Sequence, residues 1–197
     1  MKGTAPLLNG LEWITNQTAR LQRKLYIHNT GHAVCGYLGW LKGYTYIHEA
    51  AQDATIMTHI SQAIHESGTA ISMEHGFTAM DVQAYEDNLK ERLVISALPD
   101  NIRRVIRQPI RKLGKEERFL GPLMLCEKFN LPRAGLCFGI AAALNCRMPG
   151  ELQFEQMAES VDRWGPIGAL AELVDFQPEE KTAHEILQAF HSFNGGL

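Results

Sequence analysis

Residues 133–146 read RAGLCFGIAAALNC and lie in the most hydrophobic stretch of the chain. Small apolar side chains on all sides of a helix are typical of a helix that is buried all round. Polar residues, Arg133, Asn145 and Arg147, interrupt the stretch, which argues against a membrane span. We therefore predict a buried helix at the centre of the fold over residues 133–146.

The sequence on both sides of this run predicts further helices. Isoleucines at positions 56, 60, 64 and 71 repeat along one face of a helix over Asp53–Met73. Comparable patterns predict helices over Glu12–Tyr26, Ala33–Leu41, Thr78–Leu93, Lys115–Phe129, Leu152–Trp164, Pro166–Val174 and Lys181–Phe193. Only Arg92–Ser96 favours a strand, and this run is short and alone. We predict an all-α fold of about eight to ten helices.

Length and composition indicate a single globular domain. The 197 residues are 45% hydrophobic and 21% charged, with a net charge of −3. These values argue against disorder and against an overall positive field for nucleic acid. The four cysteines have neither metal-site nor disulfide-framework spacing, which favours free buried thiols in a reducing compartment. We expect one cytoplasmic helical domain over residues 1–197 that binds neither nucleic acid nor membrane.

A lysine, an asparagine and a histidine in residues 24–43, KLYIHNTGHAVCGYLGWLKG, form the first candidate site. On an ideal helix Asn29 and His32 are neighbours, whereas Lys24 lies about 140° from Asn29. An amine can exchange a proton, a carboxamide can hold a partly negative oxygen, and an imidazole can orient a hydroxyl. The spacing alone equally fits a polar helix end with an exposed lysine and a core histidine.

The second candidate is the basic segment, residues 103–118, which reads RRVIRQPIRKLGKEER. Its basic residues are Arg103, Arg104, Arg107, Arg111, Lys112, Lys115 and Arg118. Pro109 is expected to break the helix, and a bend that gathers guanidinium groups suits a phosphate or carboxylate. The alternative is a solvated basic face whose charges pair with Glu116, Glu117 and distant acids.

A metal site is not indicated. His28 and His32 are spaced to supply half of one, but no carboxylate or cysteine is suitably spaced to complete it. His48 and Glu49 are followed by Gln52 where a zinc-protease motif needs histidine. We therefore expect no bound metal.

Residues 24–43, followed further along by RVIRQPIRKL at residues 104–113, carry a specific resemblance. In this order they resemble the C-terminal domain of the polyol-specific long-chain dehydrogenase/reductase family, and within it that of the mannitol-1-phosphate 5-dehydrogenases. The resemblance extends from residues 2–13, KGTAPLLNGLEW, to the helix after Gly165 and Pro166. It implies a helical domain of the mannitol dehydrogenase or 6-phosphogluconate dehydrogenase C-terminal type, which normally follows an NAD-binding Rossmann domain.

The resemblance also implies catalytic roles. Lys24 takes the position of the family's general acid/base, Asn29 that of the oxyanion-stabilising residue, and His32 that of the residue that binds a substrate hydroxyl. Burial and nearby arginines would favour the neutral amine of Lys24, which can accept a proton. The implied reaction is the NAD-dependent interconversion of mannitol 1-phosphate and fructose 6-phosphate.

Substrate binding is implied for two basic residues of the segment. Arg104 and Lys112 match the arginine and lysine, eight positions apart, that bind the sugar chain in related enzymes. For the phosphate of the substrate we expect Arg107 and Arg111, because of their charge and location.

The sequence lacks the dinucleotide-binding motif. Its closest glycine cluster, at positions 31, 36, 39 and 43, has the wrong spacing for G-x-G-x-x-G. The chain would be either one domain of a two-domain enzyme or a standalone helical protein, and the intact Lys24–Asn29–His32 set favours the first. We expect a Rossmann domain as a partner in cis or in trans, and self-association through any exposed apolar face. Without that domain we expect no oxidation of polyols. The alternative function is a noncatalytic dimerisation or sugar-phosphate-binding module.

Overall fold

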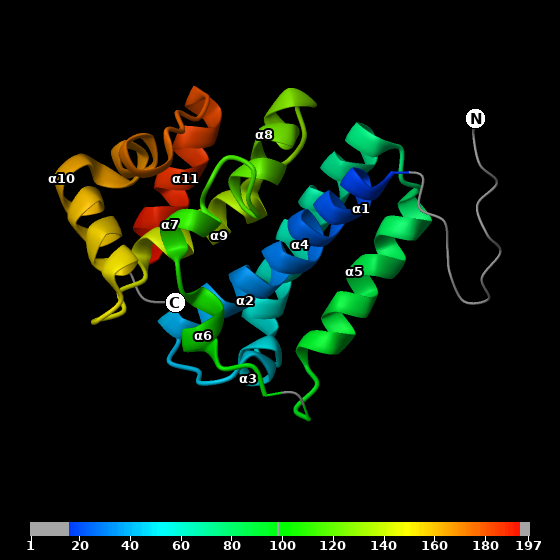
Figure 1. The fold of residues 1–197 in the computed structure, drawn as a ribbon, viewed down its shortest axis with the longest axis horizontal. Coiled ribbons are helices and arrows are strands. Elements are labelled where there is room, and N and C mark those ends of the chain that lie inside the picture. The colour runs from blue at the N-terminus through cyan, green and yellow to red at the C-terminus, as the bar shows by residue number, and fades with distance from the viewer. Residues whose placement is uncertain (1–15, 98, 194–197) are drawn as a thin grey trace, which may run out of the picture.

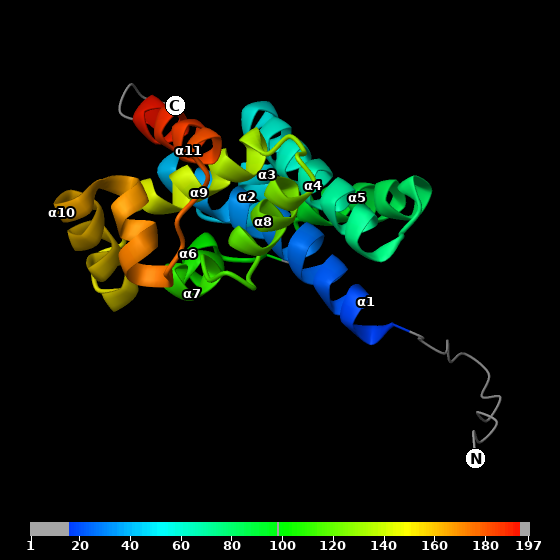
Figure 2. The ribbon, with the colours of Figure 1, turned by 90° about the horizontal axis from the view of Figure 1, so that it is seen from above.

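Helices make up the whole architecture of the part of the chain that the structure describes. The structure is a computed structural model, and it describes residues 16–97 and 99–193 (Figures 1 and 2). These residues contain no strand, and their one isolated bridge joins Tyr46 to Asn101. The elements are α1 (Gln17–Arg23), η1 (Lys24–His28), α2 (Asn29–Leu41), α3 (Ile47–Ala51), α4 (Ala54–His75), α5 (Ala79–Leu93), α6 (Ile102–Ile106), α7 (Pro109–Lys112), α8 (Leu120–Lys128), α9 (Ala134–Asn145), α10 (Leu152–Val174) and α11 (Glu180–Ser192). The predicted all-α fold is confirmed.

Helix α9 lies at the centre of this arrangement, as residues 133–146 predict. Nine of its twelve residues are buried, and it packs against α2, α4 and α11. The approach to α4 is close, because a Cβ on Gly135 would lie 2.7 Å from the backbone nitrogen of Ala63. Glycine therefore allows α9 and α4 to contact each other through their backbones.

A carboxylate from α4 caps α9. The N-cap residue of α9, Arg133, makes no side-chain capping bond. Instead Glu66, which is 5% exposed, accepts hydrogen bonds from the backbone nitrogens of Gly135 at 3.0 Å and Leu136 at 2.9 Å. Helix amides that would otherwise lack partners are thereby satisfied, and the helix dipole favours a negative charge at this end. Glu66 therefore joins two core helices.

The predicted helix boundaries differ from the observed ones mainly where a helix is kinked or begins late. Leu152–Trp164 and Pro166–Val174 form α10, which bends at Gly165, whose φ is 71°. The helix expected over Lys115–Phe129 begins only at Leu120. Glu12–Tyr26 lies partly outside the described residues. Three helices of four or five residues, α3, α6 and α7, were not predicted because such short segments show no hydrophobic period.

Some side chains differ from their predicted burial. Leu21 and Met80, apolar residues within the helices predicted over Glu12–Tyr26 and Thr78–Leu93, are 59% and 79% exposed. The segment Arg92–Ser96 is not a strand, since α5 continues to Leu93 and a turn follows. All four cysteines are buried and free, as predicted. Among the helices of the described residues, none is long and apolar enough to cross a membrane.

The Glu66 cap generates a stability prediction. Replacing Glu66 with alanine leaves two buried amides without acceptors, and we expect a loss of about 2–4 kcal/mol in the free energy of unfolding. Glu66→Gln keeps one oxygen acceptor, so it should lose clearly less. Urea denaturation of the three proteins measures both differences. Equal stability of Glu66→Ala and the unaltered protein would show that the cap is not needed.

Candidate functional site

A π-helical turn lies between α1 and α2 and contains the first candidate residue. Its five residues are Lys24–His28, and the backbone nitrogen of Asn29 donates to the carbonyl oxygen of Lys24. A π-helix closes its hydrogen bonds between residues five apart, so it holds more residues per turn than an α-helix. Lys24 and Asn29 therefore lie one turn apart on the same side. The angle of about 140° expected from an ideal helix does not apply here.

The three residues of this motif differ in burial. Asn29 and His32 are half-buried, whereas Lys24 is exposed to solvent. The burial expected for Lys24 is thus not found in this chain. The Nε2 atom of His32 is buried and lacks an aligned hydrogen-bond partner in the described residues. A buried polar atom without a partner costs free energy, and such atoms often mark a ligand site.

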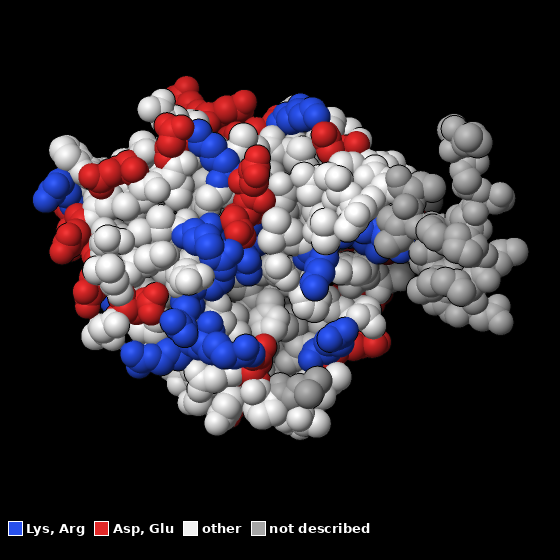
Figure 3. Space-filling view, viewed as in Figure 1, with Lys and Arg blue, Asp and Glu red and all other residues white. Residues whose placement is uncertain are grey.

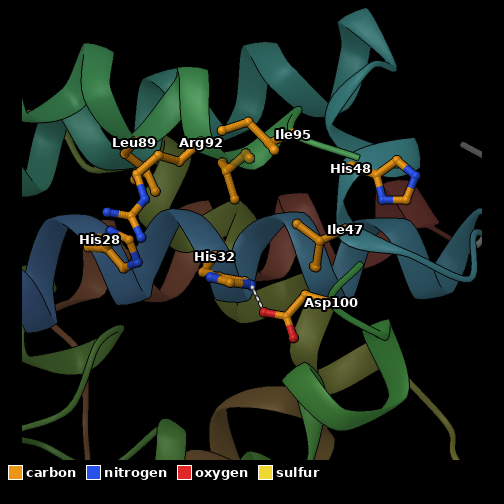
Figure 4. Close-up of a pocket in the computed structure, with 9 residues that line it drawn as sticks. His28, His32, Ile47, His48, Leu89, Arg92, Ile95 and Asp100 are labelled. Carbon is orange, nitrogen blue, oxygen red and sulfur yellow. Dashed lines mark ion pairs between the residues drawn. The ribbon is translucent and has the colours of Figure 1, made fainter. Parts of the chain in front are cut away.

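Asp100, in the loop before α6, contacts two of the candidate residues. One carboxylate oxygen lies 3.1 Å from Nε2 of His32, although the two groups are not aligned as a hydrogen bond (Figure 4). The other oxygen pairs with the guanidinium of Arg104. Asp100 therefore connects α2 to the basic segment. Reasoning from the sequence missed this contact, because no pattern relates Asp100 to His32.

The predicted bend in the basic segment is present. Helix α6 ends at Ile106, Gln108 adopts a left-handed conformation with φ 57°, and Pro109 begins α7. The bend buries Lys112, which is 6% exposed, and its amine donates to the carbonyl oxygen of Arg107.

Electrostatic effects connect this bend to α2. Burial, with smaller effects of Arg118 and Arg111, lowers the pKa of Lys112 to about 8. Burial also lowers the pKa of His32 to about 4, with added effects of Arg104, Arg118 and Lys112. The structure therefore brings His32, Arg104 and Lys112 near one another. Burial thus disfavours the charged form of Lys112.

His28 provides a similar link within the π turn. Burial, with smaller effects of His32, Arg92 and Lys24, lowers its pKa to about 4. The rings of His28 and His32 have centroids 6.1 Å apart. Lys24, His28 and His32 therefore form one polar stripe along η1 and α2. Asn29 lies next to this stripe, one π turn from Lys24.

Two of the expected residues, Arg107 and Arg111, form ion pairs with carboxylates. The Nε of Arg107 lies 3.7 Å from a carboxylate oxygen of Glu151, and Nη1 of Arg111 lies 2.7 Å from one of Glu117. Both arginines are thus already paired. Basic side chains gather over α6 and α7 on the face shown in Figure 3, with acidic ones beside them.

A small pocket of about 120 Å³ opens beside His32. Its lining comes from η1, α2, α3, α5 and the loop between α5 and α6: His28, His32, Ile47, His48, Leu89, Arg92, Leu93, Ile95 and Asp100. Of these, the sequence indicated only His28 of η1, His32 of α2 and the failed motif at His48. No cluster of three or more metal-ligating side chains was found among the described residues.

These features define a class of protein. It is an all-helical domain with a polar stripe on a π turn and a basic bend near that stripe. The model of the mannitol dehydrogenase C-terminal domain matches residues 19–190. This chain belongs to that family, and the resemblance seen in the sequence is confirmed at this level.

Two solved structures have a similar fold. Pseudomonas fluorescens mannitol 2-dehydrogenase, in a ternary complex with NAD and D-mannitol, matches with a TM-score of 0.75 and 16% identity over 92% of this chain. D-sorbitol dehydrogenase in substrate-free form matches with a TM-score of 0.70 and 15% identity, also over 92%. The chain spans 39% and 40% of those two chains. The similarity confirms the fold type.

The lowered pKa of His32 leads to a pH-dependent prediction. The unfolded chain binds a proton on this histidine near pH 6.5, whereas the folded chain binds it near pH 4. His32 therefore destabilises the fold as the pH falls through this window. The unaltered protein should lose up to about 3 kcal/mol more stability than His32→Gln between these pH values. Urea denaturation of both proteins at each pH measures this difference, and parallel pH profiles would contradict it.

Proposed function

We propose that this chain is the substrate-binding and catalytic part of an NAD-dependent polyol-phosphate dehydrogenase that interconverts mannitol 1-phosphate and fructose 6-phosphate. The observation that carries the proposal is the π turn, which puts Lys24 one turn before Asn29, close to His32, whose Nε2 makes no aligned hydrogen bond. Membership of the mannitol dehydrogenase C-terminal family supports it. One of the two similar structures is a ternary complex of its enzyme with NAD and D-mannitol, which also supports it.

In this proposal His32 orients the substrate. Since its pKa lies near 4, the ring is neutral at pH 7, and one nitrogen donates while the other accepts. A hydroxyl of the polyol supplies the aligned hydrogen bond that Asp100 does not make with Nε2. The carboxylate of Asp100, 3.1 Å from the same nitrogen, limits the rotation of the ring.

Lys24 and Asn29 act on the reacting carbon's oxygen. The neutral Nζ of Lys24 takes the proton of the secondary hydroxyl during oxidation, and the ammonium returns it to the carbonyl oxygen during reduction. The amide of Asn29 donates a hydrogen bond to the same oxygen as its negative charge grows. The π turn, in which residues five apart lie one turn apart, supports this joint role.

Arg104 and Lys112 bind the rest of the polyol chain. Asp100 fixes the guanidinium of Arg104, and the carbonyl of Arg107 fixes the amine of Lys112. Fixed donors lose little side-chain entropy when a ligand binds. For Arg107 and Arg111 to bind the phosphate, each would have to leave its carboxylate partner.

The nucleotide needs a separate domain. The described residues contain no strand and hence no strand-to-helix turn that could hold a pyrophosphate. We infer that a Rossmann domain binds NAD, in cis or in trans, and that NAD supplies the hydride acceptor. Two apolar side chains are exposed: Leu21 on α1 is 59% exposed and Met73 on α4 is 54% exposed. Such a domain, or a second copy of the chain, could cover them.

The proposal predicts a sharp dependence of turnover on Lys24 and on the partner domain. The chain alone should form no NADH from NAD and mannitol 1-phosphate, and joining it to a Rossmann domain of this family should restore turnover. In the joined enzyme Lys24→Ala should abolish most turnover, and Asn29→Ala should lower kcat by about 10²–10³.

The matched control is Lys181→Ala, which removes an exposed lysine on α11. It should keep the turnover of the joined enzyme. Near-normal turnover of Lys24→Ala, or NADH formation by the chain alone, would contradict the proposal.

A further inference from the structure

Arg92 differs from four of the five arginines of the basic segment in its charge balance. In that segment Arg104, Arg107, Arg111 and Arg118 each have a carboxylate partner. Arg92, at the end of α5, has no ion pair within residues 16–97 and 99–193, yet it lines the pocket beside His32. An uncompensated guanidinium at a pocket is suited to bind an anion from outside the chain.

His28 extends this positive corner. Figure 4 shows the guanidinium of Arg92 directed toward the His28 ring. Three neighbouring groups lower the pKa of His28: His32 on α2, Arg92 on α5 and Lys24 on η1. None of them is an acid. Asp100, the carboxylate among the described lining residues, is already engaged by His32 and Arg104. The corner at His28 and Arg92 therefore keeps a positive potential.

The size of the pocket fits one end group of a ligand. Its volume is about 120 Å³, the space of about four water molecules. This is well below the roughly 300 Å³ or more of a pocket that encloses a drug-sized ligand. Apolar neighbours, Leu89, Leu93 and Ile95, keep much of its wall free of competing donors. The pocket thus suits a phosphate-sized group rather than a nucleotide.

The corner also lies at a suitable distance from the reacting groups. His28 follows Lys24 by four residues, so the two are less than one π turn apart along η1. The carbon chain of a hexitol can reach from the reacting carbon to a terminal phosphate over such a span. One substrate can therefore contact Lys24 and Arg92 together.

We infer that Arg92 and His28 bind the phosphate group of the phosphorylated polyol. This inference rests on the proposed function and deepens it, because it places the phosphate at α5 and the π turn. Arg92 pairs with two phosphate oxygens, and His28 donates from its ring to a third. A polyol without phosphate leaves the corner empty, so these residues set the preference for phosphorylated substrates.

Calorimetric titration of the full chain with mannitol 1-phosphate, mannitol and inorganic phosphate tests the inference. The unaltered chain should bind mannitol 1-phosphate more tightly than mannitol. Arg92→Gln should weaken the binding of mannitol 1-phosphate by about 10- to 100-fold and leave the binding of mannitol unchanged. Arg92→Lys, which keeps the charge, should recover part of the loss, and inorganic phosphate should compete only when Arg92 is present.

Two further variants make the result decisive. Arg163→Gln, an exposed arginine on α10, is the matched control and should keep the preference. If Arg111→Gln removes the phosphate preference instead, or if Arg92→Gln weakens both polyols equally, the inference is wrong. Equal binding of both polyols by the unaltered chain would overturn the phosphate site alone. No binding of either polyol would contradict the proposed function as well.

Discussion

The contact between the Glu66 carboxylate and the first amides of α9 is the constraint on which the rest of the structure depends. It lies inside the core, where an unpaired amide or an unpaired carboxylate would each be costly. Because α4 also packs against α2, α5, α8 and η1, fixing α9 on α4 fixes the helices around both. Gly135 permits the approach that this contact needs. The fold is therefore organised around one polar interaction within an apolar centre.

The candidate site follows from this organisation. Helix α2 is held by α4 and α9, so the polar stripe of η1 and α2 has a fixed direction. The bend at Pro109 and the loop at Asp100 bring basic side chains to the same stripe from a distant part of the sequence. The low pKa of His32 and that of Lys112 have one cause, burial of a charge among like charges.

The sequence predicted the features that depend on local periodicity. The long helices α4, α5 and α11 repeat their apolar residues often enough to be recognised, and α9 is recognised by its small side chains. The π turn was missed, because an ideal helix puts Lys24 and Asn29 out of phase. Arg92 and Asp100 were missed because only tertiary contacts bring them to His32. The pairing of Arg107 with Glu151 was likewise invisible in the sequence.

The π turn also separates two requirements that a regular helix would couple. Hydrogen bonds between residues five apart add a fraction of a turn, so α1 is rotated relative to α2 about a shared axis. The face of α2 that packs into the core can thus remain apolar while Lys24 stays in line with Asn29. Deleting one residue from Lys24–His28 would let a regular helix run through and would improve the local hydrogen bonding. Lys24 would then lie four positions before Asn29, about 40° from it on a regular helix, so their alignment would survive while the rotation of α1 relative to α2 would be lost.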